Sequence, residues 1–321
     1  MKSTVLGCGR WGSYIAHYLN SIGHDVLLWG RENSARLKKI LTTGGNEYLN
    51  LDDNIKITSS LEDALEFSDT VFISIDSQHL RNLATTVSQY NISEKTFILC
   101  MKGIENNTGL RLTEVLIEVC GSDVQTAVWV GPGHVQNFLN GIPSCMLIDS
   151  ESTELSKELA EMLSSDLIRI YYGNDIIGAE IGAAAKNVVG IAAGMLDGLG
   201  YHSLKGALMA RGASEYSKLV VAMGGRPETI YGLSHLGDYE ATLFSQYSHN
   251  RKFGEDYVKG KEFNMLAEGV TTVKSLVMLS EKYKLDLPIS KAVYSVIYKN
   301  LDIKDGIMKL FSRPLKSEFQ S

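Results

Sequence analysis

The chain has 321 residues, enough for two domains, and its hydrophobic share of 44% and charged share of 21% are those of an ordinary globular protein. The formal net charge of −6 argues against binding to a nucleic-acid backbone, which requires a basic surface. The four cysteines form no CxxC pair, the histidines show no HxH or HxxxH spacing, and no GxSxG motif occurs. We therefore expect neither a metal site nor a serine hydrolase.

The apolar stretches of the chain predict neither a signal peptide nor a membrane span. The first stretch is too short for a signal peptide, and the longest, residues 181–196, is interrupted at its centre by Lys186 and Asn187. Such a stretch is typical of a buried helix. Together with the isolated cysteines, this pattern predicts a cytoplasmic protein.

The first half of the chain alternates short β-rich runs with helical stretches. The run 70–75 is apolar apart from serine, as expected of a parallel strand that is buried on both faces. The other predicted strands are residues 4–6, 25–29, 97–100 and 127–130, and the predicted helices include residues 11–19, 60–66 and 110–119. This alternation predicts an α/β Rossmann domain with a doubly wound, mainly parallel sheet.

The pattern changes near residue 171. Residues 180–199, 205–223 and 271–284 carry apolar side chains at helical spacing, and no convincing strand follows. We expect residues 1–173 to form the dinucleotide-binding Rossmann domain and residues 174–321 to form an all-α domain that carries substrate and catalytic residues.

A glycine motif marks the expected cofactor site. The run from Gly7 to Gly12 fits GxGxxG, directly follows a predicted strand and opens a predicted helix. Gly7 would allow the tight turn, Gly9 would let the backbone approach a pyrophosphate, and Gly12 would let helix and strand pack closely. The pyrophosphate would lie at the helix N-terminus.

The turn after the second predicted strand bears on the choice between NADH and NADPH. Arg31 could pair with the 2′-phosphate of NADPH, whereas Glu32 could bind the ribose hydroxyls of NADH. A solvated loop charge is the other interpretation of Arg31. We expect NADPH or NADH as cofactor, with a moderate preference for NADPH.

Two lysines are candidates for chemistry. Lys102 follows a predicted strand, which places it at the carboxyl edge of the sheet, and Lys186 lies in a helix of glycines and alanines. A buried lysine is costly unless it is paired, although its stem could instead reach the surface. Reduction of a ketone leaves an alkoxide that needs a proton, and a lysine whose pKa is lowered by burial and by a second cation could supply it.

A polar cluster later in the chain could complete the site. Asp238 could hold Lys186 in place, and Asn187 could orient the oxygens of the substrate. Hydrogen-bond donors for a phosphate group are offered by Thr242, Ser248, Asn250 and Arg251.

In this order, these motifs resemble the bacterial-type NAD(P)-dependent glycerol-3-phosphate dehydrogenases over nearly the whole chain. The matching runs are Gly7 to Gly12, Lys102 to Glu105, Gly131-Pro132, Glu180 to Val188, Leu236 to Asp238, Asn250-Arg251 and Glu268-Gly269. The resemblance implies interconversion of dihydroxyacetone phosphate and sn-glycerol 3-phosphate, which supplies phospholipid synthesis. It implies an active site between the two domains, and it leaves a homodimer open.

The resemblance also implies roles for individual residues. Lys186 would be the proton acceptor, and Lys102 would touch both substrate and cofactor. The substrate site would further include Gly131, Gly133, Asn187, Asp238, Thr242, Ser248, His249, Asn250 and Arg251. The cofactor site would include Gly7, Gly9, Arg10, Trp11, Gly12, Arg31, Val135, His249, Leu266 and Glu268.

Three positions depart from the family's pattern. Gly133 stands where the family usually has serine, His249 replaces arginine in its Ser-Arg-Asn run, and Asp76 begins the run that replaces its Pro-Ser-His. We expect Arg251 to carry part of the phosphate load, with His249 assisting when it is protonated. The alternative functions are a related dehydrogenase that acts on another phosphorylated polyol or on a β-hydroxy acid, and a non-catalytic NAD(P)-binding sensor. A nucleotide-sugar dehydrogenase is disfavoured because no cysteine follows Cys145.

Overall fold

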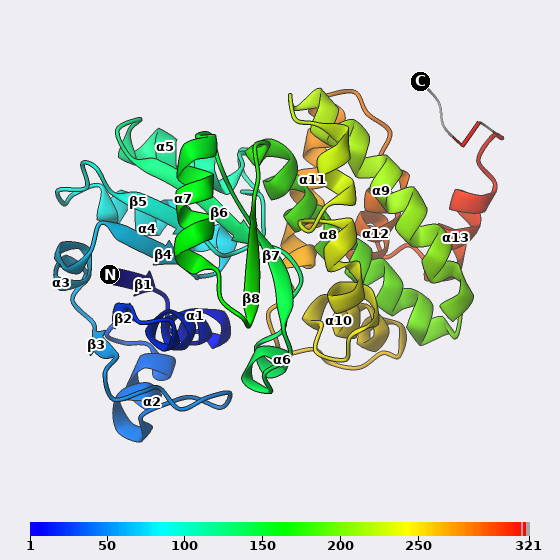
Figure 1. The fold of residues 1–321 in the computed structure, drawn as a ribbon. Coiled ribbons are helices and arrows are strands. Elements are labelled where there is room, and N and C mark those ends of the chain that lie inside the picture. Colours follow the sequence, from blue (N-terminus) through cyan, green and yellow to red (C-terminus); the bar gives the residue numbers. More distant parts are fainter. Residues whose placement is uncertain (316, 319–321) are drawn as a thin grey trace.

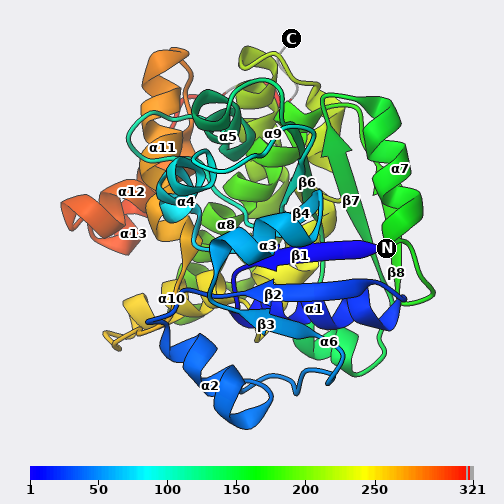
Figure 2. The ribbon, with the colours of Figure 1, turned by 90° about the vertical axis from the view of Figure 1, so that its left-hand side faces the viewer.

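An eight-stranded sheet forms the centre of the N-terminal half (Figures 1 and 2). The computed structural model describes residues 1–315, 317 and 318. In spatial order the strands are β3 (Lys56–Thr58), β2 (Asp25–Trp29), β1 (Lys2–Leu6), β4 (Thr70–Ile73), β5 (Thr96–Leu99), β6 (Gln125–Val130), β7 (Ser144–Ser150) and β8 (Ile168–Tyr172). Neighbouring strands are parallel except for the antiparallel pair β6–β7. The expected doubly wound, mainly parallel sheet is confirmed.

Helices cover both faces of this sheet because its central strands are apolar on both sides. In β4 every residue is buried, and Phe72 packs into one core cluster whereas Val71 and Ile73 pack into another. The first cluster receives side chains from α1 (Arg10–Ser21), α2 (Ala35–Thr43), α6 (Val135–Leu139) and α7 (Thr153–Leu163). The second receives them from α3 (Leu61–Phe67), α4 (Leu80–Val87) and α5 (Leu112–Cys120).

Helix α8 (Ile176–Leu199) joins the sheet to the helical half. Its first turns pack against the sheet through Ile176, Ala179 and Ala183, and its remainder is the centre of a third core cluster. By length and composition α8 could cross a membrane, but 89% of its most apolar window is buried inside the protein. Around it lie α9 (Lys205–Ala222), α10 (His249–Val258), α11 (Glu268–Lys282), α12 (Pro288–Lys299) and α13 (Ile303–Phe311) (Figure 1).

Glycines allow α10 to cross α8 at close range. A Cβ at Gly194 would lie 1.8 Å from the backbone oxygen of Arg251, and a Cβ at Gly254 would lie 2.1 Å from that of Ile191. The glycine- and alanine-rich sequence of α8 is therefore a packing requirement, and it brings α10 against the helix that carries Lys186.

All five predicted strands are present, and within the described residues no strand follows β8, as expected. Strand β4 ends two residues earlier than predicted, because Ser74 and Ile75 pack around the turn at Gly7. Strands β3, β7 and β8 were not predicted. The first has only three residues, and β8 has exposed residues at three of its five positions. Since α8 packs against both halves, the division at residue 173 stays a prediction.

We predict that the fold depends on a buried ion pair between α5 and α8. Glu180 accepts hydrogen bonds from Arg111 (Nη1, 2.6 Å) and from the hydroxyl of Thr113 (2.6 Å), and both charged residues are buried. Glu180→Ala leaves the Arg111 charge without its buried partner, which should cost about 3–5 kcal/mol. The exposed carboxylate of Glu118, which pairs with Arg81, provides the control, and Glu118→Ala should cost less than about 1 kcal/mol. Similar urea midpoints for the two variants would contradict this prediction.

Candidate active site

The glycine turn has the geometry expected of a dinucleotide site. Gly7 has a φ of 121°, and a Cβ there would lie 2.2 Å from the backbone oxygen of Ser74. A Cβ at Gly12 would lie 1.8 Å from the oxygen of Gly7, so only glycine allows α1 to start so close to β1. Gly9 precedes α1 and offers no capping side chain. The turn lies where the strand order reverses between β1 and β4, the point at which such sheets bind ligands.

The turn after β2 brings two arginines toward the glycine motif. Burial raises the pKa of the Cys8 thiol, and the hydroxyl of Ser34 and the charges of Arg36 and Arg31 act on it in the opposite direction. A Cβ at Gly9 would lie 3.3 Å from Nη1 of Arg36. Arg31 is expected from the sequence, whereas Arg36 is not, although Ser34 occupies the N-cap position of α2 and Arg36 follows it at the start of this helix.

Two lysines share one carboxylate at the carboxyl edge of the sheet. The Nζ atoms of Lys102 and Lys186 lie 2.8 Å and 2.6 Å from the same oxygen of Asp238, Oδ2. Lys102 also donates to the backbone oxygen of Gly131 (2.9 Å), and Lys186 donates to the hydroxyl of Thr242 (2.5 Å). Two ammonium groups on one carboxylate leave a net positive charge, which suits an anionic or electron-rich ligand.

The environment of Lys186 lowers the proton affinity of its amine. Burial lowers the pKa of Lys186 to about 8, Asp238 opposes this shift, and Lys102 adds to it. The side chain of Lys186 is only 7% exposed, whereas that of Lys102 is 20% exposed. The pair therefore consists of a buried amine and a more accessible one.

Irregular backbone places Asp238 and Thr242. Asp238 closes a short 3₁₀ turn (Leu236–Asp238), and Thr242 lies in a π-helical turn (Glu240–Phe244), a local structure that is frequent at functional sites. A buried imidazole anchors this segment to α8, because Nδ1 of His235 donates to the backbone oxygen of Gly182 (2.8 Å). Gly190 lets Thr242 approach α8, since a Cβ there would lie 2.8 Å from its methyl group.

The loop after β6 contributes an imidazole that sequence analysis did not assign. Nε2 of His134 donates to the backbone oxygen of Ala241 (2.7 Å), and burial lowers the pKa of His134 to about 4, so the ring is neutral. A Cβ at Gly133 would lie 2.5 Å from the ring of Phe138. Any larger residue at this departure from the family's pattern would require the ring of Phe138 to move.

Several expected substrate residues line the neighbourhood of Lys186. Asn187 is buried, and within the described part of the chain its amide makes no hydrogen bond, which leaves it free to orient a ligand. Ser248 caps α10 through the amide of Arg251 (3.3 Å). Asn250 accepts a hydrogen bond from the amide of Gly269 (2.9 Å), and so connects α10 to the start of α11.

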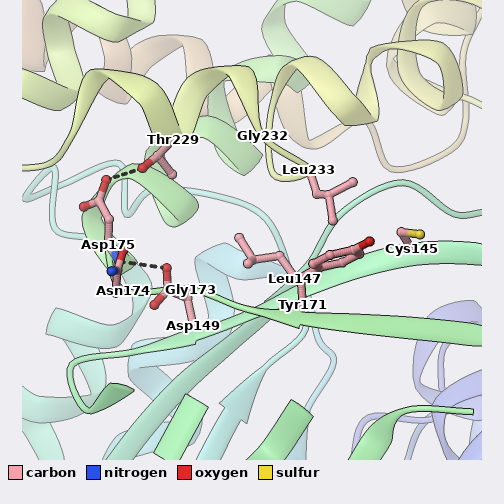
Figure 3. Close-up of a pocket in the computed structure, with 10 residues that line it drawn as sticks. All are labelled: Cys145, Leu147, Asp149, Tyr171, Gly173, Asn174, Asp175, Thr229, Gly232 and Leu233. Carbon is pink, nitrogen blue, oxygen red and sulfur yellow. Dashed lines mark hydrogen bonds between the residues drawn. The ribbon is translucent and has the colours of Figure 1, made fainter. Parts of the chain in front are cut away.

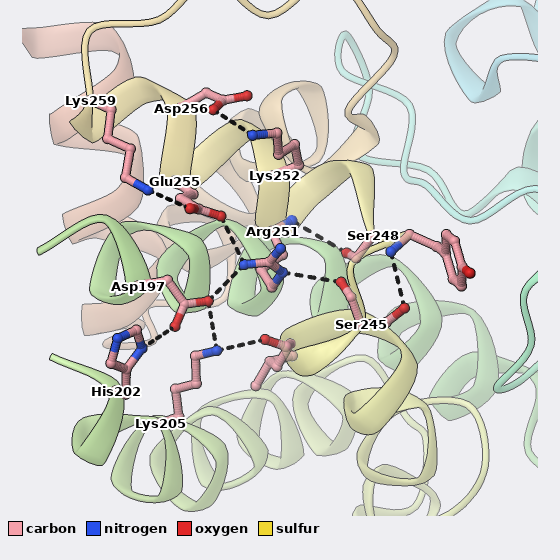
Figure 4. A network of polar contacts seen from close by, with 12 residues as sticks. Asp197, His202, Lys205, Ser245, Ser248, Arg251, Lys252, Glu255, Asp256 and Lys259 are labelled. Carbon is pink, nitrogen blue, oxygen red and sulfur yellow. Dashed lines mark hydrogen bonds and ion pairs between the residues drawn. The ribbon is translucent and has the colours of Figure 1, made fainter. Parts of the chain in front are cut away.

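Arg251 lies elsewhere, which corrects the expectation that it carries the phosphate. Its Nη1 forms ion pairs with Asp197 (2.9 Å) and Glu255 (3.0 Å), and its Nε donates to the backbone oxygen of Ser245 (Figure 4). Asp197 lies eleven positions after Lys186, roughly 16 Å along α8. Arg251 is therefore a structural residue at the far end of α8.

His249 instead meets Arg10 between the two halves of the molecule. Nδ1 of His249 donates to the backbone oxygen of Leu266 (3.1 Å), and its Nε2 lies 3.4 Å from Nη1 of Arg10. Arg10 also donates to the side chain of Gln136. The side chain of Leu266 is exposed, and its backbone oxygen accepts the hydrogen bond from His249. Sequence analysis missed Gln136 and the link from Arg10 to His249.

The remaining expected cofactor residues differ in their surroundings. Trp11 stacks on Tyr14, with ring centroids 5.5 Å apart, and the side chain of Val135 is buried in the core. The expected contact of Val135 with the cofactor stays a prediction.

Glu268 begins α11, and burial raises its pKa to about 8, with the carboxylate of Asp76 adding to the shift.

A separate hollow lies at the junction of β8 and α8 (Figure 3). It is lined by Cys145, Leu147, Asp149, Tyr171, Gly173, Asn174, Asp175, Thr229, Gly232 and Leu233. None of these is an expected site residue. Across residues 1–315, 317 and 318, no cluster of three His, Cys, Asp or Glu residues could hold a metal ion.

Known proteins match this chain along nearly its whole length. The model of the N-terminus of NAD-dependent glycerol-3-phosphate dehydrogenase matches residues 2–156, and that of the C-terminus matches residues 175–308. Glycerol-3-phosphate dehydrogenases [NAD(P)+] from Staphylococcus aureus (strain JH9) and Chlorobium phaeobacteroides (strain BS1) are 34% and 35% identical, over 99% of each chain. The crystal structure of glycerol-3-phosphate dehydrogenase from Coxiella burnetii superposes with a TM-score of 0.91 at 26% identity, covering 97% of this chain and 99% of that one. This chain therefore belongs to the NAD-dependent glycerol-3-phosphate dehydrogenase family.

Proposed function

We propose that this protein interconverts dihydroxyacetone phosphate and sn-glycerol 3-phosphate with NADPH or NADH. The observation that carries the proposal is the arrangement of Lys102 and Lys186 on one oxygen of Asp238, beside a glycine turn built for a dinucleotide. The names of relatives that match the whole chain support the same reaction.

The geometry assigns separate tasks to the residues of the site. When bound, the nicotinamide cofactor supplies or accepts the hydride. In oxidation, neutral Lys186 accepts the proton of the reacting hydroxyl at Nζ; in reduction, its ammonium group donates that proton to the developing alkoxide. Asp238 and Thr242 fix the position of Nζ, and Lys102 adds positive charge near the oxygen. Asn187 offers a free amide to a substrate hydroxyl or carbonyl.

The proposal extends to the setting of the reaction. We infer a cytoplasmic homodimer whose product, glycerol 3-phosphate, supplies phospholipid synthesis. The burial of α8 within the core supports a protein that is not anchored through that helix. Light scattering on the purified protein tests the dimer. Turnover of a panel of phosphorylated ketones and β-hydroxy acids separates the proposed substrate from its alternatives, and binding of NADPH without turnover would indicate a sensor.

We predict that Lys186→Ala removes proton transfer while cofactor binding persists. General acid–base catalysis contributes roughly 10²–10⁴-fold, so kcat should fall at least that far. The dissociation constant for NADPH, measured by fluorescence, should stay near the wild-type value. Lys218→Ala, which removes an exposed lysine from α9, serves as the control. A Lys186→Ala enzyme that keeps more than a tenth of wild-type kcat would show that another group moves the proton.

The lowered pKa of Lys186 predicts a pH dependence. Oxidation of glycerol 3-phosphate needs the neutral amine, so kcat/KM should rise with pH through about 8. The carboxylate of Asp238 raises the pKa of Lys186, and Asp238→Asn should therefore move the rising limb to lower pH while lowering the maximal rate. An unchanged midpoint of the pH profile in Asp238→Asn would show that a group other than Lys186 titrates.

The arginines after β2 predict the cofactor preference. A charge-assisted contact with the 2′-phosphate contributes about 1.5–3 kcal/mol, so Arg31→Ala or Arg36→Ala should weaken NADPH roughly ten- to a hundredfold. Binding of NADH should change little, because it lacks this phosphate. Lys38→Ala removes an equal charge from α2 and is the matched control. Equal losses for both cofactors would mean that neither arginine selects NADPH.

A further inference from the structure

Arg10 is a cation that bridges the two halves of the molecule without an acidic partner. Its guanidinium contacts His249 of α10 and Gln136 of α6, and it lies over the ring of Tyr48 at 5.3 Å. Within the described part of the chain it forms no ion pair with a carboxylate, unlike Arg81, Arg111 and Arg251.

Burial makes this isolation costly. Arg10 is partly buried, and desolvation lowers its pKa, although a guanidinium remains charged at any physiological pH. A desolvated charge with only neutral partners costs free energy unless an opposite charge joins it. The surroundings of Arg10 therefore favour an anion from outside the chain.

Short contacts connect Arg10 to the surroundings of Lys186. Arg10 donates to Gln136, and His134, two positions earlier in the chain, donates to the backbone oxygen of Ala241. The next residue, Thr242, accepts a hydrogen bond from Lys186. The positive charges of Arg10 and Lys186 also lower the pKa of His134, after the larger effect of burial. Arg10 therefore contacts the same segment that supports the hydroxyl partner of Lys186.

His249 cannot provide a permanent charge at this place. Burial lowers its pKa, and its contacts fit a neutral ring that donates from Nδ1 to Leu266 and accepts at Nε2 from Arg10. Arg10 offers a planar fork that matches two oxygens of a phosphate.

We propose that Arg10, which begins the helix after the glycine turn and donates to Nε2 of His249, binds the phosphate group of the three-carbon substrate. The proposal rests on the proposed function and names a binding residue for it. The substrate would then be held by its phosphate at Arg10 and by its reacting oxygen at Lys186. Arg10 is favoured for the substrate over the cofactor pyrophosphate because Gln136, which it contacts, lies two positions after His134, and His134 holds the segment whose Thr242 accepts from Lys186.

The test compares two ketones that differ by the phosphate. For Arg10→Ser, kcat/KM with dihydroxyacetone phosphate should fall at least tenfold, as expected for a lost charge-assisted contact. With unphosphorylated dihydroxyacetone it should stay within about twofold, and the dissociation constant for NADPH should be unchanged. Arg10→Lys keeps the charge but loses the planar guanidinium, so its kcat/KM with dihydroxyacetone phosphate should lie between those of the wild type and Arg10→Ser. The double variant Arg10→Ser/His249→Arg should recover the preference for the phosphorylated ketone, because a guanidinium is then supplied by α10.

Arg169→Ser removes an equal charge from an exposed position on β8 and is the matched control. If Arg10→Ser weakens NADPH tenfold and leaves the preference for the phosphorylated ketone intact, Arg10 binds the cofactor and the proposal is overturned. Equal losses on both ketones would also overturn it. A wild-type enzyme inactive on dihydroxyacetone phosphate would overturn the proposed function itself, and with it the substrate named here.

Discussion

The contact of two ammonium groups with a single buried carboxylate oxygen is the interaction on which the site depends. Lys102 comes from the loop after β5, Lys186 from the middle of α8 and Asp238 from the turn before the π-helical segment. Because an unpaired charge at any of these positions would be costly, the three elements stabilise one another's positions. The same contact also connects the sheet to the helical half at the place where a ligand would bind.

Close packing around α8 keeps Lys186 and Asp238 buried. Glycines at positions 190 and 194 let Thr242 and the backbone of α10 lie directly on the helix that carries the buried Lys186. Desolvation is also the largest cause of its lowered pKa. The residues that stabilise the core of the helical half thus also set the proton affinity of Lys186.

The distribution of arginines explains how the chain accommodates its departures from the family's pattern. Arg251 is committed to Asp197 and Glu255, and it stabilises the far end of α8. The pKa of His249 is lowered by burial, and a permanent charge lies beside it because Arg10 of α1 contacts its ring. A cation from the sheet half is thus present where the family's pattern has an arginine of the helical half.

The sequence by itself determined the elements whose signal is local. The glycine motif, the continuous apolar run of β4 and the helical spacing after residue 171 each reflect backbone geometry or burial over a few neighbouring residues, and they predicted the sheet, the helical half and both lysines. The family resemblance added Asp238, Ser248 and Asn250 as substrate residues, whereas the ion pairs of Arg251 with Asp197 and Glu255 became visible only in the structure. Contacts between residues more than a hundred positions apart, such as Arg10 with His249 and Lys102 with Asp238, leave no periodic trace in the chain. Tertiary structure alone decided these contacts, because they depend on how the helical half packs against the sheet.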